Sequence, residues 1–82
     1  MFEYAVEVVD QNGKFVHQID VAESLAEAKS WLKDFVKEKI AEENEHYRIL
    51  EIEYSDRDEN EDVVEQGFTI IAEYDKNGKE MI

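Results

Sequence analysis

The stretch from Ser24 to Ile40 constrains the fold most, because it has helical periodicity while the segments around it read as strands. Its apolar residues recur at spacings of three and four, which places them along one side of a helix. They are Leu25, Ala28, Leu32, Phe35, Val36 and Ile40. Ser24 followed by Glu27 is a capping box, a pattern typical of a helix start. The sequence predicts one helix, from Leu25 to about Glu43, with one buried face.

The two flanks of this helix differ in charge. Lys29, Lys33 and Lys37 follow one another at a spacing of four residues, and acidic residues line the opposite side. Like charges at this spacing destabilise a helix by roughly 0.2–0.5 kcal/mol per pair. A ridge of this kind is most often a solvated helix face. Trp31 lies at the edge of the apolar stripe, where we expect it to pack partly over the rim of a sheet, although a half-exposed tryptophan also suits an interface.

Two hairpins are predicted from turn chemistry. Residues 2–9 and 15–21 alternate apolar and polar side chains as strands do, and Asn12-Gly13 between them predicts a two-residue type I′ turn. The expected facing pairs are Gln11–Lys14, Val8–His17, Val6–Ile19 and Tyr4–Val21. The segment 75–79 repeats the chemistry of the segment 10–14, so the last three residues should form a short edge strand after a second hairpin.

The third and fourth strands follow the helix. The third covers residues 47–54, with Leu50, Ile52 and Tyr54 expected to face the helix and Tyr47, Ile49, Glu51 and Glu53 expected on the open face. The fourth begins at Val63 or Gly67, and its inward residues are expected to be Phe68, Ile70, Ala72 and Tyr74.

Together these elements predict a single α+β domain over residues 1–82. Strand two, the helix and strand three form a crossover, and its right-handedness favours strand one between strands two and three. The expected architecture is one helix on one face of a four-stranded antiparallel sheet (ββαββ, order 2-1-3-4), with a short fifth strand at the C-terminal edge.

The charge is the unusual property of this chain. It has 22 acidic and 9 basic residues and a formal net charge of −13. From Glu42 to Glu65 there are eleven acidic residues and two arginines, so −9 of the total lies in this segment. Direct binding of nucleic acid or an anionic membrane requires a basic footprint and is disfavoured. A basic protein partner is favoured, and the alternative is that acidity only keeps the protein soluble.

Other features bear on the compartment. The chain has no cysteine, which suits a reducing environment. Its first residues alternate in character and do not resemble a signal peptide, and no stretch approaches the roughly 20 apolar residues of a membrane span. We expect a soluble cytoplasmic protein.

The sequence offers no catalytic constellation or cofactor motif. Its two histidines are expected apart, His17 packed in the core and His46 helping to end the helix. Asp56, Asp58 and Asn60 match the first three ligand positions of an EF-hand loop. However, Glu61 stands where that loop needs glycine and Gly67 where it needs a bidentate glutamate. We therefore expect no enzyme activity, no cofactor and no specific metal site.

In small size, acidity and lack of a catalytic constellation, the chain resembles phage-encoded inhibitors that imitate nucleic acid, including anti-restriction and anti-CRISPR proteins. The likeness lies in surface charge alone and transfers no residue role. It implies a partner with a DNA- or RNA-binding groove, such as a nuclease, whose lysines and arginines would meet carboxylates in place of phosphates.

Two hypotheses of function follow. The first is a non-enzymatic acidic protein that docks on a basic, nucleic-acid-handling protein. Its expected contact residues are Glu51, Glu53, Asp56, Asp58, Glu59, Glu61, Asp62, Tyr47 and Ile49. The second is an interaction module or homodimer that uses the open sheet face or a free strand edge, with incidental acidity.

Overall fold

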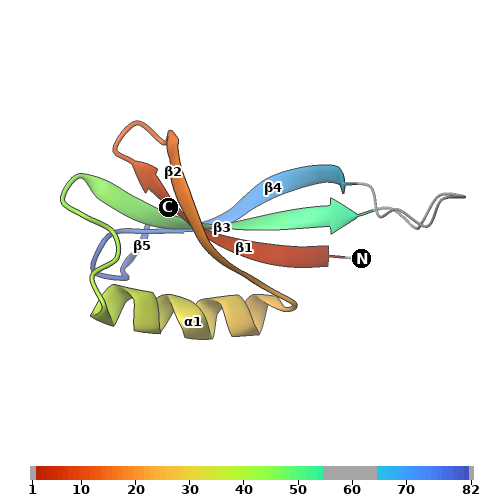
Figure 1. Cartoon of the computed structure of the whole chain (residues 1–82), viewed down its shortest axis with the longest axis horizontal. Coiled ribbons are helices and arrows are strands. Elements are labelled where there is room, and N and C mark those ends of the chain that lie inside the picture. Colours follow the sequence, from red (N-terminus) through yellow and green to blue (C-terminus); the bar gives the residue numbers. More distant parts are fainter. Residues whose placement is uncertain (1, 55–64, 82) are drawn as a thin grey trace, which may run out of the picture.

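The computed structural model describes residues 2–54 and 65–81. Its elements are β1 (Phe2–Asp10), β2 (Phe15–Ala22), α1 (Leu25–Lys37), β3 (Glu45–Tyr54), β4 (Glu65–Tyr74) and β5 (Glu80–Met81). The strands form one antiparallel sheet in the order β2-β1-β3-β4-β5, and α1 lies against one face of it (Figure 1). The predicted α+β fold, strand order and C-terminal edge strand are confirmed.

The main hydrophobic core fills the space between α1 and the sheet. Its fully buried side chains include Val6 and Val8 of β1 and Tyr47 and Ile49 of β3. Trp31 is partly buried and packs against this core, as expected. The helix packs mainly against β1 and β2, so it lies toward one side of the sheet. The part of this face near β4 and β5 is therefore less covered.

The helix starts as predicted but ends earlier. The Ser24 hydroxyl accepts a hydrogen bond from the Glu27 N–H at 3.1 Å, while the expected end near Glu43 is wrong because the helix stops at Lys37. There, Lys39 takes a left-handed conformation (φ 55°) and Ile40 donates to the Phe35 carbonyl at 3.3 Å. The Lys39 N–H donates to the Val36 carbonyl at 3.1 Å. These two hydrogen bonds form a Schellman motif that ends the helix.

A buried tyrosine holds this helix end against the sheet. The Tyr47 hydroxyl on β3 accepts a hydrogen bond from the Ala41 N–H at 2.9 Å and donates one to the Phe35 carbonyl at 3.1 Å. Backbone groups that a continued helix would have paired are thus paired with a side chain. The chain can leave the helix here without burying unsatisfied polar groups.

Both hairpins use the same turn, which differs from the expected two-residue type. Asp10 N donates to Lys14 O, and Gly13 alone has a positive φ, of 81°. This is a three-residue loop, a type I turn followed by a left-handed glycine. The Asp10 carboxylate selects it by accepting from the N–H groups of Asn12 and Lys14. Asp75 makes the equivalent bonds to residues 77 and 79 before β5.

The longer turn changes the pairing of β1 with β2. Asp10, not Gln11, pairs with Lys14, and an irregularity at Val16 then restores the predicted pair Val8–His17. A second irregularity, at Ile19, shifts the rest of the register. Val6 therefore faces Asp20, not Ile19, and Tyr4 faces Ala22, not Val21. His17, expected in the core, is exposed on this edge strand.

The two faces of β3 are the reverse of the prediction. Tyr47 and Ile49 face the helix, whereas Leu50 and Ile52 belong to a second apolar cluster on the other face. In β4, Ala72 and Tyr74 face the helix as expected. An irregularity between the pairs Ile49–Ala72 and Leu50–Ile70 then places Ile70 and Phe68 beside Leu50 and Ile52, away from the helix.

Candidate interaction surfaces

The expected contact residues separate into three groups. Tyr47 and Ile49 have no exposed surface and lie in the helix–sheet core, so their assignment to an open contact face is wrong. Glu51 is partly buried and Glu53 is exposed, both on the helix-facing side of β3. The acidic residues of the connection between β3 and β4 (Asp56, Asp58, Glu59, Glu61 and Asp62) lie outside the described residues, as does the incomplete EF-hand pattern.

Glu51 is held by a neighbouring strand. It lies opposite Tyr4 of β1. Burial of the Tyr4 ring, followed by hydrogen bonding to Glu51 and the negative charge of that carboxylate, raises the pKa of the phenol above its ordinary value. Glu51 is thus placed beside Tyr4, whereas Glu53 is exposed.

The sheet face away from the helix carries a buried ion pair. The Arg48 Nε donates to the Glu7 carboxylate at 2.7 Å, and the two side chains are 15% and 8% exposed. The charge of the Glu7 carboxylate is therefore neutralised. Nearby, His46 lies 3.4 Å from Glu73. His46 belongs to β3, so the expectation that it ends the helix is wrong.

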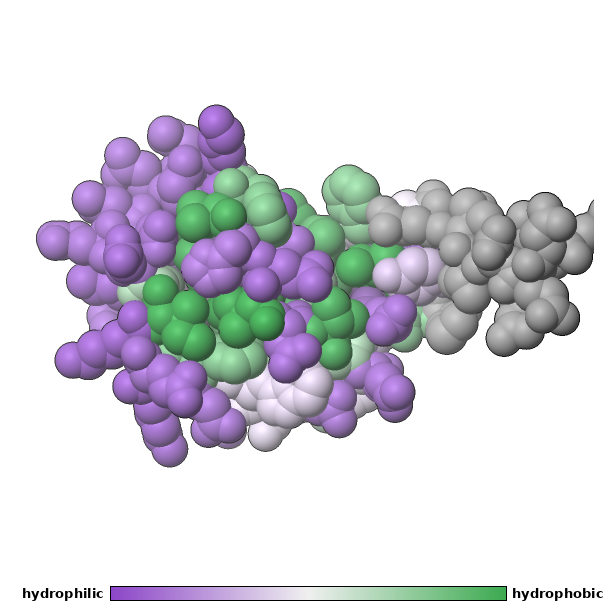
Figure 2. Space-filling view, in the orientation of Figure 1, coloured by the Kyte–Doolittle hydropathy of each residue, from purple (hydrophilic) through white to green (hydrophobic). Residues whose placement is uncertain are grey.

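Apolar side chains on the same face become exposed at β4. Ala5, Leu50 and Ile52 form the buried part of the second apolar cluster. Phe68 and Ile70 lie opposite Ile52 and Leu50 but are 66% and 49% exposed. Figure 2 views the helix and the sheet from the side and shows hydrophobic side chains between hydrophilic ones across the middle of the molecule, with hydrophilic ones gathered at the end that carries the hairpin loops. Exposed apolar groups that extend a buried cluster are typical of contact surfaces.

The outer edge of β4 is mostly free within the described residues. β5 pairs with Glu73 and Tyr74 alone, although β4 begins at Glu65. The backbone from Gly67 to Ala72 thus has no strand on its outer side in this part of the chain, a length of roughly 20 Å. Where β5 stops, Ile70, Ile71 and Met81 line a shallow hollow. An edge with unpaired N–H and C=O groups is a template for another strand.

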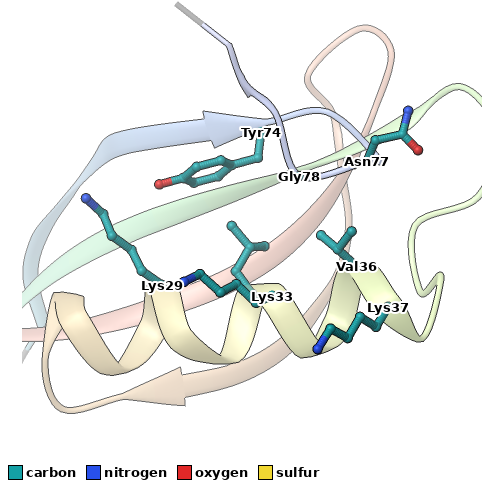
Figure 3. Close-up of a pocket in the computed structure, with 8 residues that line it drawn as sticks. Lys29, Lys33, Val36, Lys37, Tyr74, Asn77 and Gly78 are labelled. Carbon is teal, nitrogen blue, oxygen red and sulfur yellow. The ribbon is translucent and has the colours of Figure 1, made fainter.

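A different surface lies between α1 and the turn from β4 to β5. It is a groove of about 420 Å³. Leu32 and Val36 of the helix and Tyr74 of β4 form its apolar walls, and Lys29, Lys33 and Lys37 line the helix side. Figure 3 shows Lys29 rising from the helix toward the side of Tyr74. Asn77 and Gly78 close the end formed by the turn (Figure 3). The sequence showed the lysine ridge, but the groove depends on the off-centre position of the helix.

Gly78 allows the turn to approach the helix. Its φ is 85°, and a Cβ atom at this position would lie 3.2 Å from a methyl group of Val36. Any larger residue would meet both backbone strain and a crowded neighbour. The turn at this end of the groove therefore favours glycine.

Two kinds of feature are not found in the part of the chain that the structure describes. No group of three or more His, Cys, Asp or Glu side chains there could hold a metal ion. No described helix is long and apolar enough to cross a membrane. Comparison with protein-family models, curated proteins and solved structures gave no significant match.

Proposed function

We propose that this chain is a non-enzymatic binding protein that pairs an extended segment of a basic protein with the free edge of β4. The observation that carries the proposal is the stretch from Gly67 to Ala72, whose outer side pairs with no strand among the described residues, with the exposed side chains of Phe68 and Ile70 on it. In strand addition, backbone hydrogen bonds supply affinity, and side chains at alternate positions supply specificity. Phe68 and Ile70 are two residues apart and share one face, as such recognition requires.

The charge of the neighbouring strand supports a basic partner. On β3, Glu53 lies opposite Gly67 and Glu51 lies opposite Thr69. These residues lie on the sheet face opposite to that of Phe68 and Ile70. The small side chains of Gly67 and Thr69 leave a path along which lysine or arginine from an added strand reaches the carboxylates of β3. The added segment would thus place apolar residues over Phe68 and Ile70 and basic residues toward the glutamates.

The overall charge favours such a partner over a second copy of the chain. Two molecules of formal net charge −13 repel each other, whereas a basic protein is attracted over long range. A nuclease or another nucleic-acid-handling protein has the basic surface that this proposal requires. The resemblance to nucleic-acid-mimicking inhibitors adds only surface charge to this argument.

A capture experiment with matched variants tests the proposal. The wild type, the double variant Phe68→Ser/Ile70→Ser and the control Phe15→Ser/Val16→Ser are immobilised and exposed to a lysate of the source cells. Both variants lose exposed apolar side chains, the first from β4 and the second from the opposite edge of the sheet. We expect basic proteins to be retained by the wild type and the control and lost with the β4 variant.

Salt distinguishes a basic partner from a second copy. The Debye length falls from about 10 Å at 0.1 M to about 3 Å at 1 M ionic strength, so capture of a basic partner should weaken as salt rises. Sedimentation that instead shows a dimer growing stronger with salt, and absent in Phe68→Ser/Ile70→Ser, would support the homodimer. Equal capture by all three proteins would exclude the β4 edge.

A further inference from the structure

The ridge of Lys29, Lys33 and Lys37 is a local exception in an acidic protein. The chain has 22 acidic residues, yet none of these three lysines forms an ion pair with any residue that the structure describes. Three unpaired cations four residues apart repel one another along the helix. An acidic residue at one of these three positions would make the helix more stable. The arrangement is suited to an anion from outside the chain.

Beneath the ridge, the groove offers apolar surface as well as charge. Its walls include Tyr74, which is 9% exposed, and the helix residues Leu32 and Val36. A volume of about 420 Å³ lies within the range of small binding pockets. A simple inorganic anion would leave this apolar surface uncovered. The ligand must therefore be both anionic and apolar.

The spacing of the lysines indicates the form of the ligand. Residues four apart on a helix are separated by about 6 Å along its axis. Alternate residues of an extended peptide are separated by roughly 6.6 Å and point to the same side. Carboxylates at alternate positions would thus face successive lysines, and the residues between them would face Tyr74.

We infer that the groove between α1 and the β4–β5 turn binds an extended acidic peptide in which carboxylates alternate with apolar side chains. Charge complementarity with the lysine ridge favours an acidic peptide as the ligand. The apolar wall favours a peptide whose carboxylates alternate with apolar side chains. The site is separate from the free edge of β4, because it lies on the helix-facing side and uses Tyr74 and the turn. It does not depend on the function proposed above.

Glu80 limits the affinity of the groove. It lies opposite Tyr74 on β5, and its charge, after the effect of burial, contributes to raising the pKa of the Tyr74 phenol. The pairing of β5 with β4 thus places a carboxylate beside Tyr74, where it would repel an acidic ligand. Glu80→Gln should therefore tighten binding, whereas a ligand that avoids this side of the groove would be unaffected.

The test uses a short fluorescently labelled peptide in which glutamate alternates with leucine. Fluorescence anisotropy is recorded at about 0.15 M salt, where the Debye length of about 8 Å screens the more distant acidic residues. Lys33→Gln should weaken binding by up to about fivefold, the range of one exposed ion pair, and the triple variant Lys29→Gln/Lys33→Gln/Lys37→Gln by roughly 3-fold to 160-fold. Lys14→Gln, which removes the same charge from the β1–β2 loop, should change it less than twofold, within the weakest exposed pairs.

Two control peptides separate charge from apolar contact. A peptide with glutamine in place of glutamate and one with serine in place of leucine should both bind more weakly than the parent. The inference is overturned if the triple variant binds as Lys14→Gln does, or if the glutamine peptide binds as well as the parent. It is also overturned if Glu80→Gln leaves binding unchanged, or if sedimentation shows a dimer of the wild type that the triple lysine variant does not form.

Discussion

Removal of the Tyr47 hydroxyl should show how strongly the sheet holds the end of the helix. In Tyr47→Phe, the Ala41 N–H loses its acceptor at 2.9 Å, and both residues are buried (6% and 0% exposed), so water cannot replace it. An unsatisfied buried donor costs about 1–3 kcal/mol. The Phe35 carbonyl keeps the Ile40 N–H as a partner at 3.3 Å, so its loss adds little. We expect a loss of about 2 kcal/mol in the free energy of unfolding.

Urea unfolding followed by Trp31 fluorescence measures this loss. Trp31 is partly buried against the main core and therefore reports on global unfolding. The midpoint should fall while the slope with urea stays constant, because the exposed surface on unfolding is unchanged. For a domain of this size, a loss of about 2 kcal/mol corresponds to a drop in Tm of roughly 8–16 °C.

Tyr4→Phe is the matched control. It removes the same group from a partly buried position, where water can bind Glu51 in place of the phenol, so the loss should stay below about 1 kcal/mol. In Tyr47→Phe, hydrogen exchange at the Ala41 amide should also accelerate more than at Val6, in the centre of the sheet. A Tyr47→Phe protein within about 0.5 kcal/mol of the wild type would refute the role of this hydroxyl.

Three further outcomes are expected. Lys39→Gly should raise the free energy of unfolding by about 0.5–1 kcal/mol, since glycine adopts the left-handed φ of 55° without a Cβ clash; an unchanged urea midpoint would argue against strain at Lys39. Arg48→Met should lower the free energy of unfolding by about 3–5 kcal/mol, because it leaves the Glu7 carboxylate buried and unpaired. Glu7→Leu/Arg48→Met should recover most of this loss, and equal urea midpoints for the single and double variants would contradict the prediction. Burial and the charge of Glu80 raise the pKa of Tyr74 in the folded state. Above about pH 10, the Tyr74 phenol therefore loses its proton first in the unfolded chain, and the free energy of unfolding falls. Urea midpoints measured across this pH range should fall less steeply for Tyr74→Phe than for the wild type.

The strand order was predictable because local signals determine it. The capping box at Ser24, the two Asp-X-Asn-Gly-Lys segments and the period-two segments each act over a few residues. One helical crossover between two hairpins leaves few arrangements that keep its right hand. The order β2-β1-β3-β4-β5 follows from these signals without any knowledge of the core.

The faces of the strands were not predictable, because both faces of the sheet are partly apolar. In β3, Ile49 and Leu50 are adjacent and both buried, one in each apolar cluster. Alternation distinguishes inside from outside only when one face is polar. The irregularities at Val16 and Ile19 of β2 and at Ile71 of β4 involve apolar residues as well, so a shift of one residue there leaves no trace in the hydrophobic pattern.

The helix end illustrates a different limit. Residues 41–43 favour a helix by propensity, and no glycine marks the stop. The positive φ angles at Lys39 and Asn44 show where the chain turns. Of these two residues, Asn44 is the local sequence signal that the prediction missed, because asparagine adopts the left-handed conformation more readily than most residues. The deciding contact comes from Tyr47, whose position depends on the sheet.

The same dependence explains why neither interaction surface could be built from the sequence. β4 takes part in both surfaces, because the irregularity near Ile71 reverses the side to which its residues point. Ala72 and Tyr74 face the helix, whereas Phe68 and Ile70 face the opposite side. A regular strand would have placed all four on one face, with the apolar residues under the helix and no apolar side chains along the free edge. The short length of β5 then decides how much of this edge another chain can reach, and the off-centre position of α1 decides how much of the lysine groove stays open.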